Sequence, residues 1–302
     1  MQKINEVIKG LIKQEHEYED NQKTEFTVKE VVPTGFTDID KSMQGGLKRG
    51  ELVVIGSRPG MGKTSFAMNV AYYVAVTKHT PVAVFSMETS IEHLVLRILS
   101  SEAGIDHNLV RDALSQSMLK NDQWSSLINV SRKLSRAPFY IDDKTDISPQ
   151  HIHERLCRLN EKHTIGLVVI DYLQLMSADS SASTRDLEIS EIVTSLKAIA
   201  EGFHVPVVLL SQMNRNQEER PDKTPRLSDF RMYAAIEQNA NIICFIYRDE
   251  VYNPETPDKC IADIITAKPR KPRSEPVDTI HMKWCPNILK FEDLPPHENQ
   301  RC

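Results

Sequence analysis

The residues with the clearest chemical signature form a short glycine-rich run, SRPGMGKT, over residues 57–64. The run follows an apolar, β-branched stretch (ELVVIG) and precedes an apolar stretch that favours a helix (SFAMNVAYYVAV). A strand, a glycine loop and a helix in this order are typical of a phosphate-binding loop, whose backbone N–H groups and helix N-terminus face an anion. The predicted nucleotide-binding residues are Ser57, Arg58, Pro59, Gly60, Met61, Gly62, Lys63, Thr64 and Ser65.

Two side chains of this loop have expected roles of their own. Lys63 is expected to reach the β- and γ-phosphates, and the Thr64 hydroxyl is expected to hold Mg²⁺. The loop departs from the usual pattern at its first glycine, where Ser57 stands with Gly56 one position earlier. Because both flanks fit, ATP and Mg²⁺ are the predicted cofactors.

Three further polar residues, Glu88, Asp171 and Gln212, each end an apolar run. The carboxyl ends of parallel strands meet at the ligand edge of a sheet, so these side chains are expected near the phosphates. Asp171 would hold the water shell of Mg²⁺, Glu88 would take a proton from an attacking water, and Gln212 would sense the γ-phosphate and signal to residues 213–236. The simpler alternatives are a helix cap, a solvated acid in a first helical turn, and an ordinary strand-end amide, respectively.

A basic cluster follows the apolar run IADIITA and consists of Lys268, Arg270, Lys271 and Arg273. In a ring-shaped assembly, Lys268 and Arg270 could reach the γ-phosphate bound by a neighbouring subunit, as arginine fingers do. The alternatives are a solvated basic loop and a direct contact with DNA phosphate.

The elements that must position these residues alternate along the chain. Short β-rich runs are separated mostly by helical stretches, which predicts an α/β fold with a mostly parallel sheet covered by helices on both faces. The last two runs (DTIHMKW and ILKFED) have no helix between them, so an antiparallel edge hairpin is expected at the C-terminus. Two polar loops, Ser177–Arg185 and Asn214–Arg226, are of the kind on which functional residues concentrate.

The N-terminal residues carry a different pattern. Apolar residues recur with helical spacing at Ile4, Val7, Ile8, Leu11 and Ile12, which predicts an amphipathic helix over residues 1–20. That helix packs either on its own domain or on another subunit. Residues 21–32 are then a linker, and residues 33–302 form the main domain.

Composition narrows the class of protein. The chain has 302 residues, 40% of them hydrophobic, which is typical of globular proteins and excludes collagen and overall disorder. Its net charge of −5 argues against non-specific coating of nucleic acid but is compatible with a local basic channel. No apolar run approaches the roughly 20 residues that a membrane helix needs. The five cysteines include no C-x-x-C pair, so we expect no zinc site or disulfide framework and a cytoplasmic location.

Together the motifs resemble the C-terminal motor domain of DnaB-type replicative DNA helicases, a RecA-like phosphate-loop ATPase that forms hexameric rings. The resemblance covers nearly the whole chain. It is carried by SRPGMGKT and by PTGFTDID (33–40), FSME (85–88), LVVIDYLQLM (167–176), PVVLLSQMNR (206–215), PRLSDFR (225–231), AIEQNAN (235–241) and FIYRDEVY (245–252).

The resemblance implies an ATP-driven motor that moves 5′→3′ along single-stranded DNA. It implies that Lys63, Glu88 and Gln212 act in hydrolysis together with Lys268 and Arg270 of the next subunit. Arg248, in the FIYR motif, is implied to line the nucleotide pocket. The N-terminal helix then resembles the family's linker helix, and a helicase loader and a primase are implied partners.

Three departures leave room for other functions. The family's primase-recruiting N-terminal domain has no counterpart in this sequence. In the DNA-gripping loop, Arg231 is retained as the expected DNA contact, but Met232, Tyr233 and Ala234 replace the usual Glu-Ser-Gly. The segment after Arg270 carries prolines in place of glycines, which makes it stiffer. The alternatives are a degenerate helicase paralogue and a RecA- or KaiC-like regulatory ATPase that acts as a replication assembly factor.

Overall fold

The computed structural model describes residues 2–4, 6, 30–116, 119–179, 183–230, 233–270 and 278–295. Its strands are β1 (Gln2–Lys3), β2 (Val31–Val32), β3 (Leu47–Lys48), β4 (Leu52–Ser57), β5 (Val82–Ser86), β6 (Phe139–Asp142), β7 (Leu167–Asp171), β8 (Val207–Gln212), β9 (Ile242–Tyr247), β10 (Ile261–Lys268), β11 (Asp278–Cys285) and β12 (Lys290–Asp293). Its longer helices are α2 (Thr37–Ser42), α3 (Lys63–Tyr72), α4 (Ile91–Ala103), α5 (His107–Gln116), α6 (Asn121–Arg136), α7 (Pro149–Asn160), α8 (Arg185–Gly202) and α9 (Tyr233–Asn239). The short helical turns are η1 (Tyr73–Thr77), η2 (Leu173–Leu175), η3 (Arg215–Glu219), η4 (Leu227–Asp229) and η5 (Asp249–Val251).

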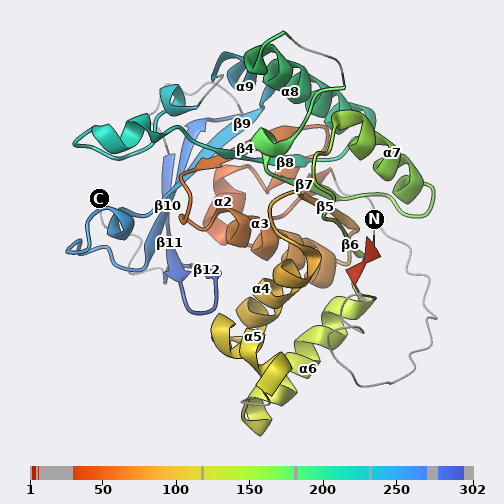
Figure 1. The fold of residues 1–302 in the computed structure, drawn as a ribbon, viewed down its shortest axis with the longest axis vertical. Helices are drawn as coiled ribbons and strands as arrows, with labels where there is room; N and C mark the ends of the chain where they lie inside the picture. Colours follow the sequence, from red (N-terminus) through yellow and green to blue (C-terminus); the bar gives the residue numbers. More distant parts are fainter. Residues whose placement is uncertain are drawn as a thin grey trace.

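One large sheet organises the domain, with the strand order β1-β6-β5-β7-β8-β4-β9-β10-β11-β12 (Figure 1). The six strands from β6 to β9 in this order are parallel to one another. Strand β4, which leads into the phosphate loop, lies between β8 and β9 and is buried along its whole length. The predicted α/β fold with a mostly parallel, doubly covered sheet is confirmed.

Helices cover both faces of the sheet. Helix α3 packs on one face, and α8, joined by α7 and α9, packs on the other (Figure 1). Helix α8 begins where the Thr184 hydroxyl accepts the N–H of Leu187, an N-cap, and it buries Ile192 and Leu196 against the sheet. Helices α4, α5 and α6 form a group of their own beside α3. Among the described residues, no helix has the length and apolarity that crossing a membrane requires.

The C-terminal strands reverse the direction of the sheet. Only the short turn η5 precedes β10, so β10 runs antiparallel to β9, and β11 and β12 continue the antiparallel order. The predicted edge hairpin is therefore confirmed as β11–β12. Its Phe291 N–H donates to Asn69 Oδ1 of α3 at 2.9 Å, and a Cβ built on Gly62 would lie 2.9 Å from the Phe291 ring. The hairpin thus packs directly beneath the phosphate loop.

The N-terminal prediction needs correction where residues are described. Gln2 and Lys3 form β1, paired antiparallel with β6, so these two residues are strand rather than helix. An edge strand such as β6 offers unpaired backbone groups that a passing segment can bond. Residues 31 and 32, expected in the linker, form β2 and pair with β3. Most of the predicted docking helix lies outside the described residues, so the helix and the domain boundaries remain predictions.

Candidate nucleotide-binding site

The phosphate loop connects β4 to α3 in a tight turn. Gly60 and Gly62 have φ values of 81° and 96°, in the left-handed region that glycine adopts without strain. Gly62 is the N-cap of α3, so the first free N–H groups of that helix face the loop. The predicted strand–loop–helix geometry is therefore present.

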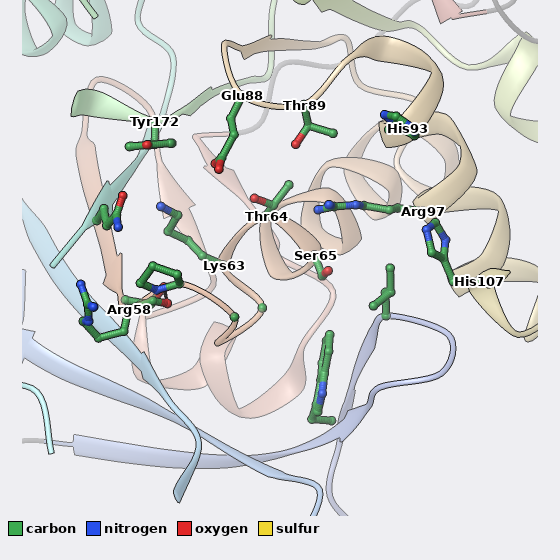
Figure 2. A pocket seen from close by; sticks show the side chains of 17 residues that line it. Arg58, Lys63, Thr64, Ser65, Glu88, Thr89, His93, Arg97, His107 and Tyr172 are labelled. Atoms are coloured by element: carbon green, nitrogen blue, oxygen red, sulfur yellow. Dashed lines mark hydrogen bonds between the residues drawn. The ribbon is translucent and has the colours of Figure 1, made fainter. Parts of the chain in front are cut away.

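The loop borders a cavity of about 700 Å³ (Figure 2). A cavity of this volume lies within the usual range for small-molecule sites. The lining residues are Ser57, Arg58, Pro59, Gly60, Gly62, Lys63, Thr64, Ser65, Glu88, Thr89, His93, Arg97, His107, Tyr172, Gln212, Trp284 and Leu289. The sheet thus brings the predicted phosphate-loop residues, Glu88 and Gln212 to one cavity.

Thr64 and Asp171 form a pair suited to a hard cation. The Thr64 Oγ1 donates to Asp171 Oδ2 at 2.6 Å, and Asp171 is only 1% exposed. Its other oxygen, Oδ1, is buried and has no hydrogen-bond partner among the described residues. Mg²⁺ prefers such oxygen ligands, and a buried carboxylate oxygen without a partner is costly unless something binds it. The two side chains therefore fit the predicted Mg²⁺.

Lys63 points into the space where phosphate is expected. Its Nζ lies 4.5 Å from the centre of the Tyr172 ring, and Figure 2 shows the Lys63 and Glu88 side chains directed toward the same space. Burial lowers the pKa of Lys63, while the charges of Asp171 and Glu88 oppose that shift. A partly desolvated ammonium beside two carboxylates is a strong attractor for the negative oxygens of a phosphate chain.

Gln212 is held at the cavity by its neighbour Gln174. The Gln212 N–H donates to Gln174 Oε1 at 3.0 Å, and Gln174 Nε2 donates back to the Gln212 carbonyl at 3.0 Å. This reciprocal pair fixes the backbone of Gln212 while its side chain lines the cavity. Sequence reasoning did not assign Gln174 a role, although it lies within the LVVIDYLQLM stretch.

Two predicted nucleotide residues take supporting positions instead. The Met61 side chain is 1% exposed and packs in the core, so this residue offers the nucleotide only its backbone. Arg248 does not line the cavity. It donates to the Gly60 carbonyl at 2.9 Å, pairs with Glu250 at 2.7 Å and lies 5.0 Å from the centre of the Trp284 ring. The expectation that Arg248 lines the pocket is wrong, because Glu250 and Trp284 hold it against the outside of the loop.

The far side of the cavity contains residues that sequence reasoning missed. His93 and Arg97 of α4, His107 of α5 and Trp284 of β11 all line it. The Arg97 side chain extends toward Thr64 in Figure 2 and lines the cavity near the phosphate loop. Burial and the nearby charge of Arg97 lower the pKa of His107. The one signal available was the four-residue spacing of His93 and Arg97 on the helix that follows Glu88.

A phosphate loop with these neighbours occurs in a known family of domains. Residues 31–293 match the family model of the DnaB-like helicase C terminal domain. The chain belongs to this family. This membership confirms the resemblance that the motifs indicated.

Curated members of the DnaB-like helicase family resemble the chain along most of its length. It is 40% identical over 264 residues to the replicative DNA helicase DnaB of Geobacillus stearothermophilus, which covers 87% of this chain and 56% of that protein. It is 38% identical to the DnaB of Haemophilus influenzae, with coverage of 87% and 55%. The chain thus spans about half the length of the curated relatives that it matches.

Two solved structures share the fold. One is a helicase-type ATPase domain solved by itself, which superposes with a TM-score of 0.81 at 33% identity, covering 87% of this chain and 91% of that one. The other is a DnaB-like replicative helicase whose structure addresses its interactions with primase; it gives the same TM-score and identity, covering 87% of this chain and 62% of that one. The RecA-like architecture expected from the resemblance is therefore confirmed.

In this DnaB-like domain, the two predicted fingers lie away from their own cavity. Lys268 Nζ donates to the carbonyl of Ala240 at 2.6 Å and to that of Glu237, at the end of α9. Arg270 forms a two-pronged pair with Glu51, with N–O distances of 2.6 and 2.8 Å, and also donates to the carbonyl of Gly46. Both cations are thus occupied by acceptors of their own chain.

The predicted DNA contact, Arg231, lies outside the described residues. Phe230, directly before it, is 3% exposed and packs against Phe245 with a ring-centre distance of 5.3 Å. A Cβ built on Gly56 would lie only 2.5 Å from the Phe230 ring, so this ring rests on the strand end that opens the phosphate loop.

Proposed function

We propose that this domain is the ATP-hydrolysing motor of a replicative DNA helicase, which moves 5′→3′ along single-stranded DNA as a hexameric ring. The observation that carries the proposal is the Thr64–Asp171 pair with its unpartnered Oδ1, placed beside Lys63 on the phosphate loop. This set of groups suits a nucleotide triphosphate bound with Mg²⁺, and it lies in a chain of the DnaB-like family.

Each side chain has a role that follows from its position. Lys63 and the N–H groups at the start of α3 bind phosphate oxygens, and Thr64 and Asp171 hold Mg²⁺, which neutralises charge that develops on the phosphates. Glu88 accepts the proton of the attacking water. Gln212 senses the γ-phosphate from the end of β8, and Arg97 supplies a second positive charge from α4.

Assembly into a ring would complete the site. Lys268 and Arg270 of one subunit would act on the nucleotide of the next, and Arg270 must first leave Glu51 to do so. Binding to the strand would be mostly to phosphate, so it would be independent of sequence and sensitive to salt. A related helicase has been studied for its interactions with primase, and we extend a primase and a helicase loader to this chain as proposed partners.

The deciding experiment measures steady-state ATP hydrolysis with and without single-stranded DNA, with Lys63→Ala as the blank. We expect hydrolysis that DNA stimulates and that Lys63→Ala abolishes. Glu88→Gln serves as the matched variant, because it should bind ATP normally while hydrolysis collapses. Hydrolysis indifferent to DNA would instead favour the regulatory ATPase or assembly factor, and an unchanged rate in Lys63→Ala would refute the site.

A further inference from the structure

The side chain of Arg58 turns away from the phosphates, although its backbone belongs to the phosphate loop. The residue is 8% exposed. Its Nε and Nη2 contact Glu218 Oε1 at 2.8 and 2.7 Å, and its Nη1 donates to the Met213 carbonyl at 2.8 Å. Figure 2 shows Arg58 on the side of the cavity opposite Arg97. All three contacts reach one segment, residues 213–230, which follows Gln212 and which we call the bridge segment.

The bridge segment is braced within itself. Arg220 contacts both oxygens of Asp229 at 2.8 Å, and the Asn214 N–H donates to the Asp229 carbonyl at 3.0 Å. These contacts join the beginning of the segment to its end. Because charge-assisted, two-pronged bonds resist bending, the segment is expected to shift as one piece rather than to deform locally.

The phosphate loop contacts the bridge segment at two places. Arg58 holds its first half through Met213 and Glu218. At its far end, the Phe230 ring rests on Gly56, where a Cβ would lie 2.5 Å away. The residue after Phe230 is Arg231, the expected DNA contact. One braced segment therefore joins the loop that surrounds the phosphates to the start of the expected DNA loop.

We propose that the Arg58–Glu218 pair is a positioning link that couples the nucleotide state of the phosphate loop to DNA binding through the bridge segment. When phosphates occupy or leave the loop, the backbone of Arg58 must adjust, and its guanidinium transmits that shift to Glu218. The inference rests on the proposed function and names how that function's two ligands communicate. Such coupling is reciprocal: if the nucleotide changes DNA affinity, DNA changes nucleotide affinity by the same factor.

Glu218 is the right residue to remove. Its side chain is 40% exposed, so its loss leaves no buried carboxylate and should not unfold the domain. Its carboxylate reaches the phosphate loop through Arg58. Glu219 is the matched control, because it is the adjacent acid on η3, is exposed and forms no ion pair among the described residues.

The experiment uses the whole chain and a fluorescent oligothymidine strand. Its dissociation constant is measured with Mg²⁺ plus ADP and with Mg²⁺ plus a non-hydrolysable ATP analogue. The ratio of the two constants is the coupling factor, expected at about 5- to 150-fold in the unmodified chain, the usual range for coupled sites. Glu218→Ala should reduce the ratio to about twofold or less without changing hydrolysis in the absence of DNA. Glu219→Ala should leave the ratio intact, and Glu218→Asp should restore part of it.

The outcomes separate the two proposals. A Glu218→Ala ratio equal to that of the unmodified chain overturns the link. Loss of DNA-independent hydrolysis in Glu218→Ala also overturns it, because the pair would then merely support the site. An unmodified chain that binds no single strand with either nucleotide overturns the proposed function itself, on which the link depends.

Discussion

The ion pair between Arg270 and Glu51 predicts a measurable loss of stability when Arg270 is replaced by alanine. The two side chains are only 10% and 11% exposed, so water screens the pair little. Arg270 also donates to the carbonyls of Gly46 and Met43. Among the described residues, Arg270 is the only side chain that pairs with the Glu51 carboxylate.

The magnitude follows from what the variant leaves behind. Arg270→Ala strands a nearly buried carboxylate, and breaking such a pair from one side costs about 3–5 kcal/mol. The small remaining exposure of Glu51 places the expected loss near the lower end, at about 3 kcal/mol. At roughly 2 °C per kcal/mol for a chain of this size, the melting temperature should fall by about 6 °C. Glu51→Gln combined with Arg270→Gln removes both charges and should recover about 2 kcal/mol.

The assay is urea unfolding of the isolated subunit without nucleotide, followed by circular dichroism. The slope against urea should stay constant, so that a change in midpoint reports stability. Arg226→Ala is the matched control, because its pair with Asp222 is more than half exposed and is worth at most about 1 kcal/mol. A loss below about 1 kcal/mol in Arg270→Ala would refute the reasoning. Arg270 would then be free in the lone subunit and able to reach a neighbour without breaking a stable pair.

Three further predictions concern the cavity and the bridge segment. Because burial and Arg97 lower the pKa of His107 below its usual value of 6.5, the unfolded chain binds more protons near that pH, and stability should rise as the pH increases toward 6.5. His107→Gln should flatten this dependence of the urea midpoint between about pH 5 and 7, and identical slopes would contradict the assignment. Gly56→Ala should cost about 1–3 kcal/mol through overlap with the Phe230 ring, and adding Phe230→Leu should restore part of it; a neutral Gly56→Ala would show that the contact is absent. Asp171→Asn should remove the effect of Mg²⁺ on binding of an ATP analogue, measured by titration with and without chelator, and a full Mg²⁺ effect in the variant would show that the metal is held elsewhere.

The sequence alone was enough to predict the local parts of this domain. The phosphate loop depends on a strand, a glycine turn and a helix that are adjacent in the chain, so its geometry can be predicted from neighbouring residues. Glu88 and Gln212 could be assigned to the site because a residue at the carboxyl end of a parallel strand lies at the ligand edge whatever the strand order. The periodicity of apolar residues likewise predicted the alternating elements and the C-terminal hairpin.

Only the tertiary structure decided the contacts between distant segments. Strand order places β4 between β8 and β9, and no local pattern contains that information. Arg270 meets Glu51 across a separation of 219 residues, and Arg58 meets Glu218 across 160, so each pair depends on how whole elements pack. The expectation that Arg248 lines the pocket failed for the same reason, since Glu250 and Trp284 compete for its guanidinium. Periodicity and turn chemistry act over a few residues and select elements, whereas burial of apolar faces and pairing of charges act between elements and select their partners.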